Sequence, residues 1–403
     1  MDIGDRSDET SLDELRALLE TAGGEAVGYV LQTRPAPEPR SFIGSGKVAE
    51  VKALVDAEGC DLVLFDNELS PSQSNVLSSE LGVRVLDRSG IILDIFAGRA
   101  RSREGRIQVE LAQYKYLLPR LTGMWTHLVR QTASGGRSPI GTRGPGETQL
   151  ETDRRHIRRK IQKLEEELED VRRIRGTQRR MREKNSMPTA ALVGYTNAGK
   201  STLLNALTGS DIQTGDRLFD TLDTTTRKLI LDENSELLVS DTVGFIRKLP
   251  HHLVEAFKAT LDELKYADVL LHVIDVSNPD WEQQAKVTDG LIEELGVSAT
   301  PRIDVYNKCD RCLVSELKRS ENSVCISAVT GEGLDELKQR ISAVLSRGIK
   351  EISMLLPYGK ASVLDLLHRE SKVLYTEYGD EGISVKAACT PEIYARIKEY
   401  VTV

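Results

Sequence analysis

The segment GYTNAGKST begins at Gly194 and spaces glycine, lysine and hydroxyl side chains as G-x-x-x-x-G-K-[ST]. Glycines in this pattern let backbone N–H groups curl around a β-phosphate, and the N-terminus of the following helix attracts the same anion. Lys200 would reach the β- and γ-phosphates as a catalytic group, and the Ser201 hydroxyl would bind Mg²⁺. The pattern predicts a nucleoside triphosphate site made of Gly194, Tyr195, Thr196, Asn197, Ala198, Gly199, Lys200, Ser201 and Thr202.

A second motif, DTVG, ends a strand-like segment at residues 241–244. Asp241 would hold the Mg²⁺, through a water molecule, because Mg²⁺ keeps much of its hydration shell. The Gly244 N–H would meet the γ-phosphate and so take part in catalysis. Thr242 and Val243 would line the same loop.

A third motif, NKCD at residues 307–310, selects the base. Asp310 can accept hydrogen bonds from the N1–H and the amine of guanine, and adenine lacks that donor pair. Asn307 would tie the base-binding loop to the phosphate loop, and the Lys308 stem would pack on the base. In the following CISAVTG segment, a backbone N–H near Ala328 would serve the guanine carbonyl, so the base-side residues are Asn307, Lys308, Asp310, Ser327, Ala328 and Val329. The order and spacing of the motifs predict GTP rather than ATP.

The segment LFDTLDTTT, residues 218–226, should sense the γ-phosphate, because it lies between Lys200 and Asp241. It offers several threonines, and spacing alone does not choose which would complete the Mg²⁺ shell. Phe245 follows Gly244, where many signalling GTPases have a glutamine that orients water. We therefore expect slow intrinsic hydrolysis, helped by a partner, by a switch backbone group or by K⁺ bound near Asn197.

Cys309 and Cys312 overlap the guanine motif and have the spacing of a metal or redox pair. No second pair stands at ligand spacing elsewhere in the sequence, and Asp310 is already assigned to guanine. We interpret the pair as incidental.

These motifs need a sheet that positions them, and strand-like and helix-like segments alternate from residue 188 to residue 348. That alternation predicts a mostly parallel α/β sheet with helices on both faces. The segment KLILDENSELLVSD reads as a hairpin that adds an antiparallel edge strand. Residues 25–100 suggest a small βαβ-type domain, and the last 55 residues suggest another small α/β domain.

Two stretches have apolar side chains at heptad spacing, which predicts two long helices packed antiparallel. The first stretch contains Leu111, Tyr114, Leu118, Leu121, Trp125 and Leu128, and the second contains Leu150, Ile157, Ile161, Leu164, Leu168 and Val171. If residues 150–184 form one helix, it is about 50 Å long at 1.5 Å per residue. The segment between them, SGGRSPIGTRGPGETQ, is rich in glycine and is expected to form a flexible, basic tip.

Charge along the chain is uneven. The whole chain has a net charge of −8, whereas residues 99–160 hold 14 Lys and Arg against 5 Asp and Glu. An acidic protein with one concentrated basic segment is expected to point that segment at a polyanion; the alternative is a solvated helical face. The acidic N-terminus and short apolar stretches predict neither a signal peptide nor membrane insertion, and scattered cysteines favour a reduced cytoplasm.

Several of these segments resemble the HflX family of translational GTPases. They are FIGSGK, VELAQYKYLLPRL, GTRGPGETQLETDRR, GYTNAGKSTL, LFDTLDTTTR and DTVGFIRKLPHHLVEAF, which occur in the same order as in the family and cover roughly residues 25–348. The resemblance implies a GTPase that binds the large ribosomal subunit and its rRNA, and that splits or rescues stalled or idle ribosomes under stress.

The resemblance also implies site residues. Thr221 would be the switch threonine, a catalytic group and a Mg²⁺ ligand beside Ser201 and Asp241, and the switch residues near the nucleotide would be Phe219, Asp220, Thr221, Leu222 and Asp223. The family usually has a small residue in place of Asp220 and often proline in place of Thr224. The basic loop and the helix after it would contact ribosomal RNA through Arg137, Arg143, Arg154, Arg155, Arg158 and Arg159.

These expectations give four domains: an N-terminal α/β domain (1–108), a helical hairpin with a basic tip (109–187), a GTPase domain (188–348) and a small C-terminal α/β domain (349–403). We expect a cytoplasmic, monomeric, Mg²⁺-dependent GTPase that uses GTP and GDP. Two alternatives stay open. One is a GTPase switch that assists RNA assembly or modification, and the other is a scaffold that binds nucleotide without useful turnover.

Overall fold

The computed structural model describes residues 7–121, 145–184, 187–210, 215, 218–232, 235–249, 253, 261–312, 322–346, 350–379, 382–389 and 391–402. It divides into two compact units. Unit 1 contains Met1–Val171, Gly215–Asp223 and Val243–Thr260, and unit 2 contains Arg172–Thr214, Thr224–Thr242 and Leu261–Val403.

The N-terminal part of unit 1 is built on two short parallel strands, β1 (Leu62–Phe65) and β2 (Arg84–Asp87). Helix α3 (Pro71–Leu81) connects them, and it starts where the sequence favours a start, since Ser70 and Gln73 form a capping box. Helices α1 (Ser7–Thr21), α2 (Ser45–Glu58) and α4 (Arg88–Arg99) complete this part. This arrangement agrees with the predicted βαβ pattern.

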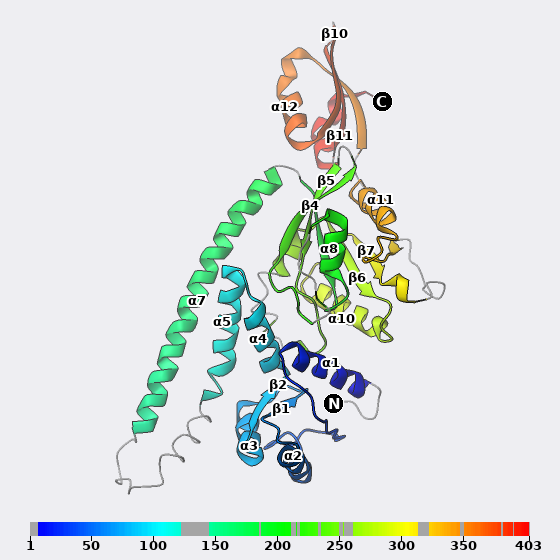
Figure 1. The fold of residues 1–403 in the computed structure, drawn as a ribbon. Coiled ribbons are helices and arrows are strands. Elements are labelled where there is room, and N and C mark those ends of the chain that lie inside the picture. The colour runs from blue at the N-terminus through cyan, green and yellow to red at the C-terminus, as the bar shows by residue number, and fades with distance from the viewer. Residues whose placement is uncertain are drawn as a thin grey trace. The chain divides into compact units, whose positions relative to one another are not determined.

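After α4 comes an antiparallel helix pair, α5 (Arg103–Leu117) and α7 (Pro145–Lys184), and α7 belongs to unit 1 as far as Val171 (Figure 1). Their shared core contains Ile107, Leu111, Tyr114, Ile161, Leu164, Leu168 and Val171. Six of these seven residues come from the two predicted heptad stretches, so the pairing is confirmed. Helix α7 begins five residues earlier than expected, because Pro145 suits the first turn of a helix. Trp125, Leu128 and the glycine-rich segment before Pro145 lie outside the described residues.

Unit 2 has a six-stranded sheet of order β4-β5-β3-β6-β7-β8. Its strands are β3 (Thr189–Gly194), β4 (Thr225–Asp232), β5 (Ser235–Asp241), β6 (Val269–Asp275), β7 (Arg302–Asn307) and β8 (Ser323–Cys325). All neighbours pair in parallel except β4, which pairs antiparallel with β5 at the sheet edge. The predicted mostly parallel α/β sheet with a hairpin edge strand is confirmed.

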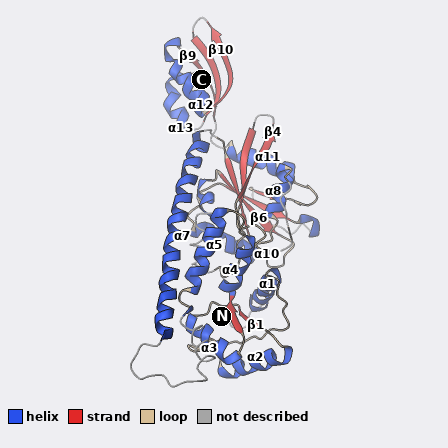
Figure 2. Cartoon of the chain, turned by 60° about the vertical axis from the view of Figure 1, so that its left-hand side comes forward, coloured by secondary structure: helices blue, strands red, loops and turns tan. Residues whose placement is uncertain are grey.

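Helices cover both faces of this sheet (Figure 2). Helices α8 (Lys200–Thr208) and α11 (Leu334–Leu345) share one core with Val273 and Val305. Helix α10 (Trp281–Glu294) packs its first turn against Ile274 and Tyr306 instead. Neighbouring residues of a strand point to opposite faces, so α10 covers the other face. Short 3₁₀ helices lie at Asp262–Tyr266 and Cys309–Arg311.

The C-terminal part of unit 2 forms a separate four-stranded sheet of order β10-β11-β9-β12. Its strands are β9 (Lys350–Leu356), β10 (Lys372–Gly379), β11 (Gly382–Cys389) and β12 (Val401–Thr402), with helices α12 (Ala361–Glu370) and α13 (Pro391–Ile397) and 3₁₀ helices at Tyr358–Lys360 and Lys398–Tyr400. The α/β character predicted for this region is confirmed. In the described part of the chain, no helix is long and apolar enough to cross a membrane.

Candidate nucleotide site

The phosphate-loop motif connects the end of β3 to the start of α8, and both of its fixed glycines have a steric reason. Gly194 has a φ of 153°, and a Cβ there would collide with the carbonyl oxygen of Val273. Gly199 has a φ of 91°, and a Cβ there would collide with the side-chain amide of Asn307. Only glycine lets the backbone approach its neighbours this closely. Between them, Asn197 also has a positive φ, of 62°.

Lys200 is buried at the first turn of α8, 5% exposed. Its ammonium donates to the carbonyl oxygens of Gly194, at 3.1 Å, and Tyr195, at 2.8 Å. Burial lowers the pKa of Lys200 to about 8, and the nearby Asp241 carboxylate opposes that shift. The Lys200 ammonium is therefore held inside the phosphate loop, which would also hold the phosphates of a bound nucleotide.

Two oxygen donors for a hard cation lie together at the end of β5. The Ser201 hydroxyl donates to the Asp241 carboxylate at 2.6 Å, and Asp241 is 1% exposed. β3 and β5 are neighbours with Leu192 opposite Asp241, and the Thr242 hydroxyl donates to the Leu192 carbonyl at 2.6 Å. A hydroxyl and a carboxylate at this separation are a donor set that fits Mg²⁺.

Asn307 connects the base-side and phosphate-side loops. Its Nδ2 donates to the Ala198 carbonyl at 2.8 Å, and its Oδ1 accepts from the Ala328 backbone N–H at 3.0 Å. Lys308, with a φ of 65°, donates to the Asn197 carbonyl at 3.0 Å and pairs with Asp275 at 2.7 Å. Three motifs that are distant in the sequence therefore meet around one loop.

The remaining base-side residues lie on the same edge of the sheet. Asp310 sits in the 3₁₀ turn Cys309–Arg311, and its carboxylate is 3.9 Å from the Arg311 guanidinium. Ser327 is fully buried and its hydroxyl accepts from the Thr330 N–H, whereas Val329 is 77% exposed. Residues 327–330 therefore place backbone groups and the exposed side chain of Val329 beside Asn307.

The cysteines of the guanine motif lie in an apolar cluster with Ile274 and Tyr306. Burial, together with the neighbouring Cys325, raises the pKa of the Cys309 thiol to about 12. The pKa of Cys312 is raised for the same reasons. Within the described ranges, no group of three or more His, Cys, Asp or Glu side chains could hold a metal ion.

The switch segment belongs to unit 1, where it packs against the N-terminal helices. Phe219 is 2% exposed, and its ring meets that of Phe96 edge-on at 4.7 Å. Asp220 pairs with Arg99 at 3.3 Å, and Leu222 is 3% exposed. Thr221 lies between these anchored residues. These contacts with α4 are not predictable from the local sequence, which indicates a role at the nucleotide for Phe219, Asp220 and Leu222.

The segment after Gly244 also belongs to unit 1. Phe245 is 1% exposed, so its ring is an interior group. Lys248 pairs with Asp66. Asp66 also accepts from Ser11 at 2.7 Å and from the buried Arg88 at 2.6 Å.

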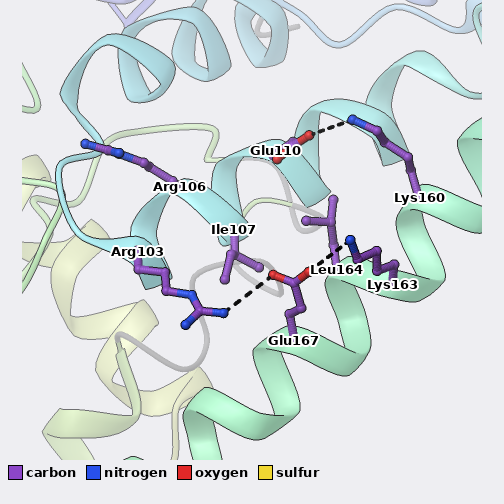
Figure 3. A pocket seen from close by; sticks show the side chains of 8 residues that line it. All are labelled: Arg103, Arg106, Ile107, Glu110, Lys160, Lys163, Leu164 and Glu167. Carbon is purple, nitrogen blue, oxygen red and sulfur yellow. Dashed lines mark hydrogen bonds and ion pairs between the residues drawn. The ribbon is translucent and has the colours of Figure 1, made fainter.

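Charged side chains line a groove of about 350 Å³ between α5 and α7 (Figure 3). Glu167 faces both Arg103, at 4.0 Å, and Lys163, at 3.7 Å, while Lys160 pairs with Glu110 at 3.3 Å. With Arg106, the groove has four cations and two carboxylates. The charge count over residues 99–160 includes Arg103, Arg106, Glu110 and Lys160, but Lys163 and Glu167 lie beyond it and the groove itself was not predicted.

The predicted RNA-contacting residues that are described lie on the first half of α7. Arg158 and Arg159 are exposed, and Arg155 pairs weakly with Glu151 at 3.7 Å. Arg154 is partly buried. Arg137 and Arg143 lie outside the described residues.

The doubly covered sheet and its loops define a phosphate-loop GTPase. Four family models match in order along the chain: GTP-binding GTPase N-terminal (9–97), GTP-binding GTPase Middle Region (99–182), 50S ribosome-binding GTPase (189–308) and HflX C-terminal domain (312–392). The chain belongs to the HflX family of GTPases, and it binds and hydrolyses GTP. The last match extends the family likeness beyond residue 348.

Relatives match over nearly the full length. The GTPase HflX of Caldanaerobacter subterraneus is 49% identical over 99% of this chain and 92% of its own. That of Escherichia coli is 45% identical over 87% of this chain and 82% of its own. A GDP-bound GTP-binding protein from Sulfolobus solfataricus is 26% identical over 83% of this chain and 95% of its own, with a TM-score of 0.43.

Proposed function

We propose that this chain is a ribosome-associated GTPase that binds the large ribosomal subunit and splits or rescues stalled or idle ribosomes. One observation carries the proposal: a basic helix pair stands directly before a GTPase region that matches the 50S ribosome-binding GTPase model. RNA is a polyanion, and its phosphates attract clustered arginines and lysines. In this proposal the protein acts in the cytoplasm as a monomer.

The helix pair provides the RNA-facing side. Arg154, Arg155, Arg158 and Arg159 stand along α7, and Arg137 and Arg143 precede it in the sequence. The groove between α5 and α7 adds two further net positive charges, from four cations and two carboxylates. Binding through these side chains releases counterions, so it weakens steeply with salt.

The GTP-binding residues provide the switch. The phosphate loop and Lys200 would bind the phosphates, Asn307 and Asp310 would select guanine, and Ser201, Asp241 and Thr221 would hold Mg²⁺. Mg²⁺ neutralises charge on the phosphates when it is bound. Gly244 meets the γ-phosphate, and Asn197 is the residue that would face a K⁺ ion. The Phe245 ring cannot orient the attacking water, so intrinsic GTP hydrolysis is slow and the ribosome stimulates it.

The test measures GTP hydrolysis by the full chain, alone and with purified large ribosomal subunits, at low and moderate salt. We expect strong stimulation that falls with salt and is lost when residues 134–149 are deleted. The double reversal Arg158→Glu with Arg159→Glu should also abolish it. Its matched control, Lys286→Glu with Lys386→Glu, makes the same charge change at two exposed sites outside the helix pair.

Equal stimulation of both double variants would contradict the role of the arginines. Absence of any stimulation of the unmodified chain by large subunits would contradict the ribosomal function itself. Retained GTP binding in every variant shows that the effects do not come from unfolding.

A further inference from the structure

Asp223 closes the N-terminus of helix α5. Its carboxylate accepts from the backbone N–H groups of Arg101, at 2.8 Å, and Ser102, at 2.7 Å, and also from the Ser102 hydroxyl. Ser102 is the N-cap of α5, and its own oxygen accepts from the Gly105 N–H at 2.9 Å. A carboxylate here satisfies N–H groups that the helix leaves open and complements the helix dipole. This cap comes from a residue 121 positions away.

Gly105 gives independent evidence that the site is shaped for this carboxylate. The residue is buried in the first turn of α5, and a Cβ added there would collide with Asp223 Oδ1. Glycine is an unfavourable residue inside a helix by about 1 kcal/mol relative to alanine. The helix therefore carries a weak helix former at the one place where the Asp223 carboxylate needs the space.

Asp223 stands two residues after Thr221, and Phe219 stands two residues before it. Two residues of extended chain span at most about 7 Å, so Thr221 cannot travel far unless Asp223 moves with it. Phe219 is anchored on Phe96 of α4, and Asp223 is anchored on α5. The switch segment is thus held on one side by α4 and on the other by α5, which is one helix of the basic pair.

We propose that Asp223 is a positioning residue that couples the γ-phosphate-sensing segment to helix α5. If Thr221 moved to bind Mg²⁺ and the γ-phosphate, the short chain between them would pull Asp223 away from the N-terminus of α5, and that end of the helix pair would loosen. Coupling of this kind is reciprocal: an event that frees the start of α5 favours the GTP-bound switch by the same factor. The inference rests on the proposed role of Thr221, and it needs no ribosome.

The experiment is amide hydrogen exchange of residues 99–106 in the full chain, with Mg²⁺ and either GDP or a non-hydrolysable GTP analogue. We expect exchange at Arg101 and Ser102 to be at least tenfold faster with the analogue. In Gly105→Ala, which leaves the switch sequence intact, exchange should be fast with both nucleotides. The matched control is Gly98→Ala, a helical glycine of α4 with open space around it, which should behave like the unmodified chain.

Equal or slower exchange with the analogue in the unmodified chain would overturn the proposal, and so would a nucleotide-dependent difference that survives in Gly105→Ala. Asp223→Asn keeps the shape but removes the charge, and it should give intermediate exchange. The kinetics of GTP hydrolysis give a second measure. Loss of the contact between Asp223 and the start of α5 should change kcat more than KM. A failure of ribosomal stimulation leaves these measurements unaffected, so the two proposals fail separately.

Discussion

The side-chain amide of Asn307 is bonded to both Ala198 in the phosphate loop and Ala328 in the base-side loop, at 2.8 and 3.0 Å. Asn307 is 2% exposed, so both bonds lie in the interior. One side chain therefore fixes the distance between the part of the site that would hold phosphate and the part that would hold guanine.

Replacing Asn307 with alanine should weaken GDP and GTP binding by about 10- to 100-fold. The change leaves a buried donor and a buried acceptor without partners, at a cost of about 1–3 kcal/mol each. Titration with a fluorescent GDP analogue measures the loss. Asn278→Ala, which removes a local bond to the Asp280 N–H in the same unit, is the control and should bind normally. Equal affinity of both variants would contradict the bridging role.

The nucleotide-free protein should become more stable as the pH rises from about 8 towards 10.5, because of Lys200. Its pKa is about 8 when folded, against 10.5 when unfolded, so the unfolded chain binds more protons in that interval. The depressed pKa of Lys200 therefore has its full cost in stability below about pH 8, and the cost falls progressively as the pH rises from about 8 to 10.5. The full difference corresponds to about 3 kcal/mol.

Urea unfolding at pH 7 and at pH 9.5 measures this effect against Lys200→Met. The methionine variant should be more stable than the unmodified chain at pH 7, should lack this part of the pH dependence, and should lose nucleotide binding. An unmodified chain and a Lys200→Met variant with parallel pH profiles would show that the ammonium is not desolvated.

Introducing glutamine at Phe245 should not raise intrinsic GTP hydrolysis. The ring is 1% exposed in unit 1, so an amide there would enter an apolar interior without assured partners. We expect a loss of about 2–4 kcal/mol in the free energy of unfolding, measured with urea, and no faster single-turnover hydrolysis. Phe245→Leu keeps an apolar group and should lose less stability. A large rate gain in Phe245→Gln would show that the side chain reaches the attacking water.

Periodicity and motif order were enough to predict the six-stranded sheet of unit 2, the heptad pairing of α5 with α7 and the α/β character of the C-terminal region. These features depend on residues that are close in sequence or that repeat regularly. The contacts of Asp223 and Phe219 could not be predicted in this way. Nothing local to either residue marks its partner, because Ser102 and Phe96 lie more than a hundred positions earlier. Gly105 was the one available signal, a glycine in a helical pattern without an evident reason.

The role of Asn307 was predicted only in part from the sequence. The motif predicted a link between two loops, and the structure supplies the atoms that make it. The burial of Phe245 was not predictable, because a phenylalanine after Gly244 reads equally well as a missing catalytic group and as a core residue.

The order in which the segments of unit 1 occur along the chain has a consequence for folding during synthesis. Its N-terminal portion ends at Val171, but two of its segments, Gly215–Asp223 and Val243–Thr260, come later in the chain. A ribosome that is synthesising this protein therefore releases Phe96 and the start of α5 well before Phe219 and Asp223 exist to cover them. These N-terminal side chains stay incompletely packed while about 120 further residues are added, because Ser102 and Asp223 are 121 positions apart, and this takes about 6 to 24 s at about 5–20 residues per second. During that interval the nascent chain is exposed to chaperones and proteases, and a fragment ending near residue 184 would remain in that state permanently.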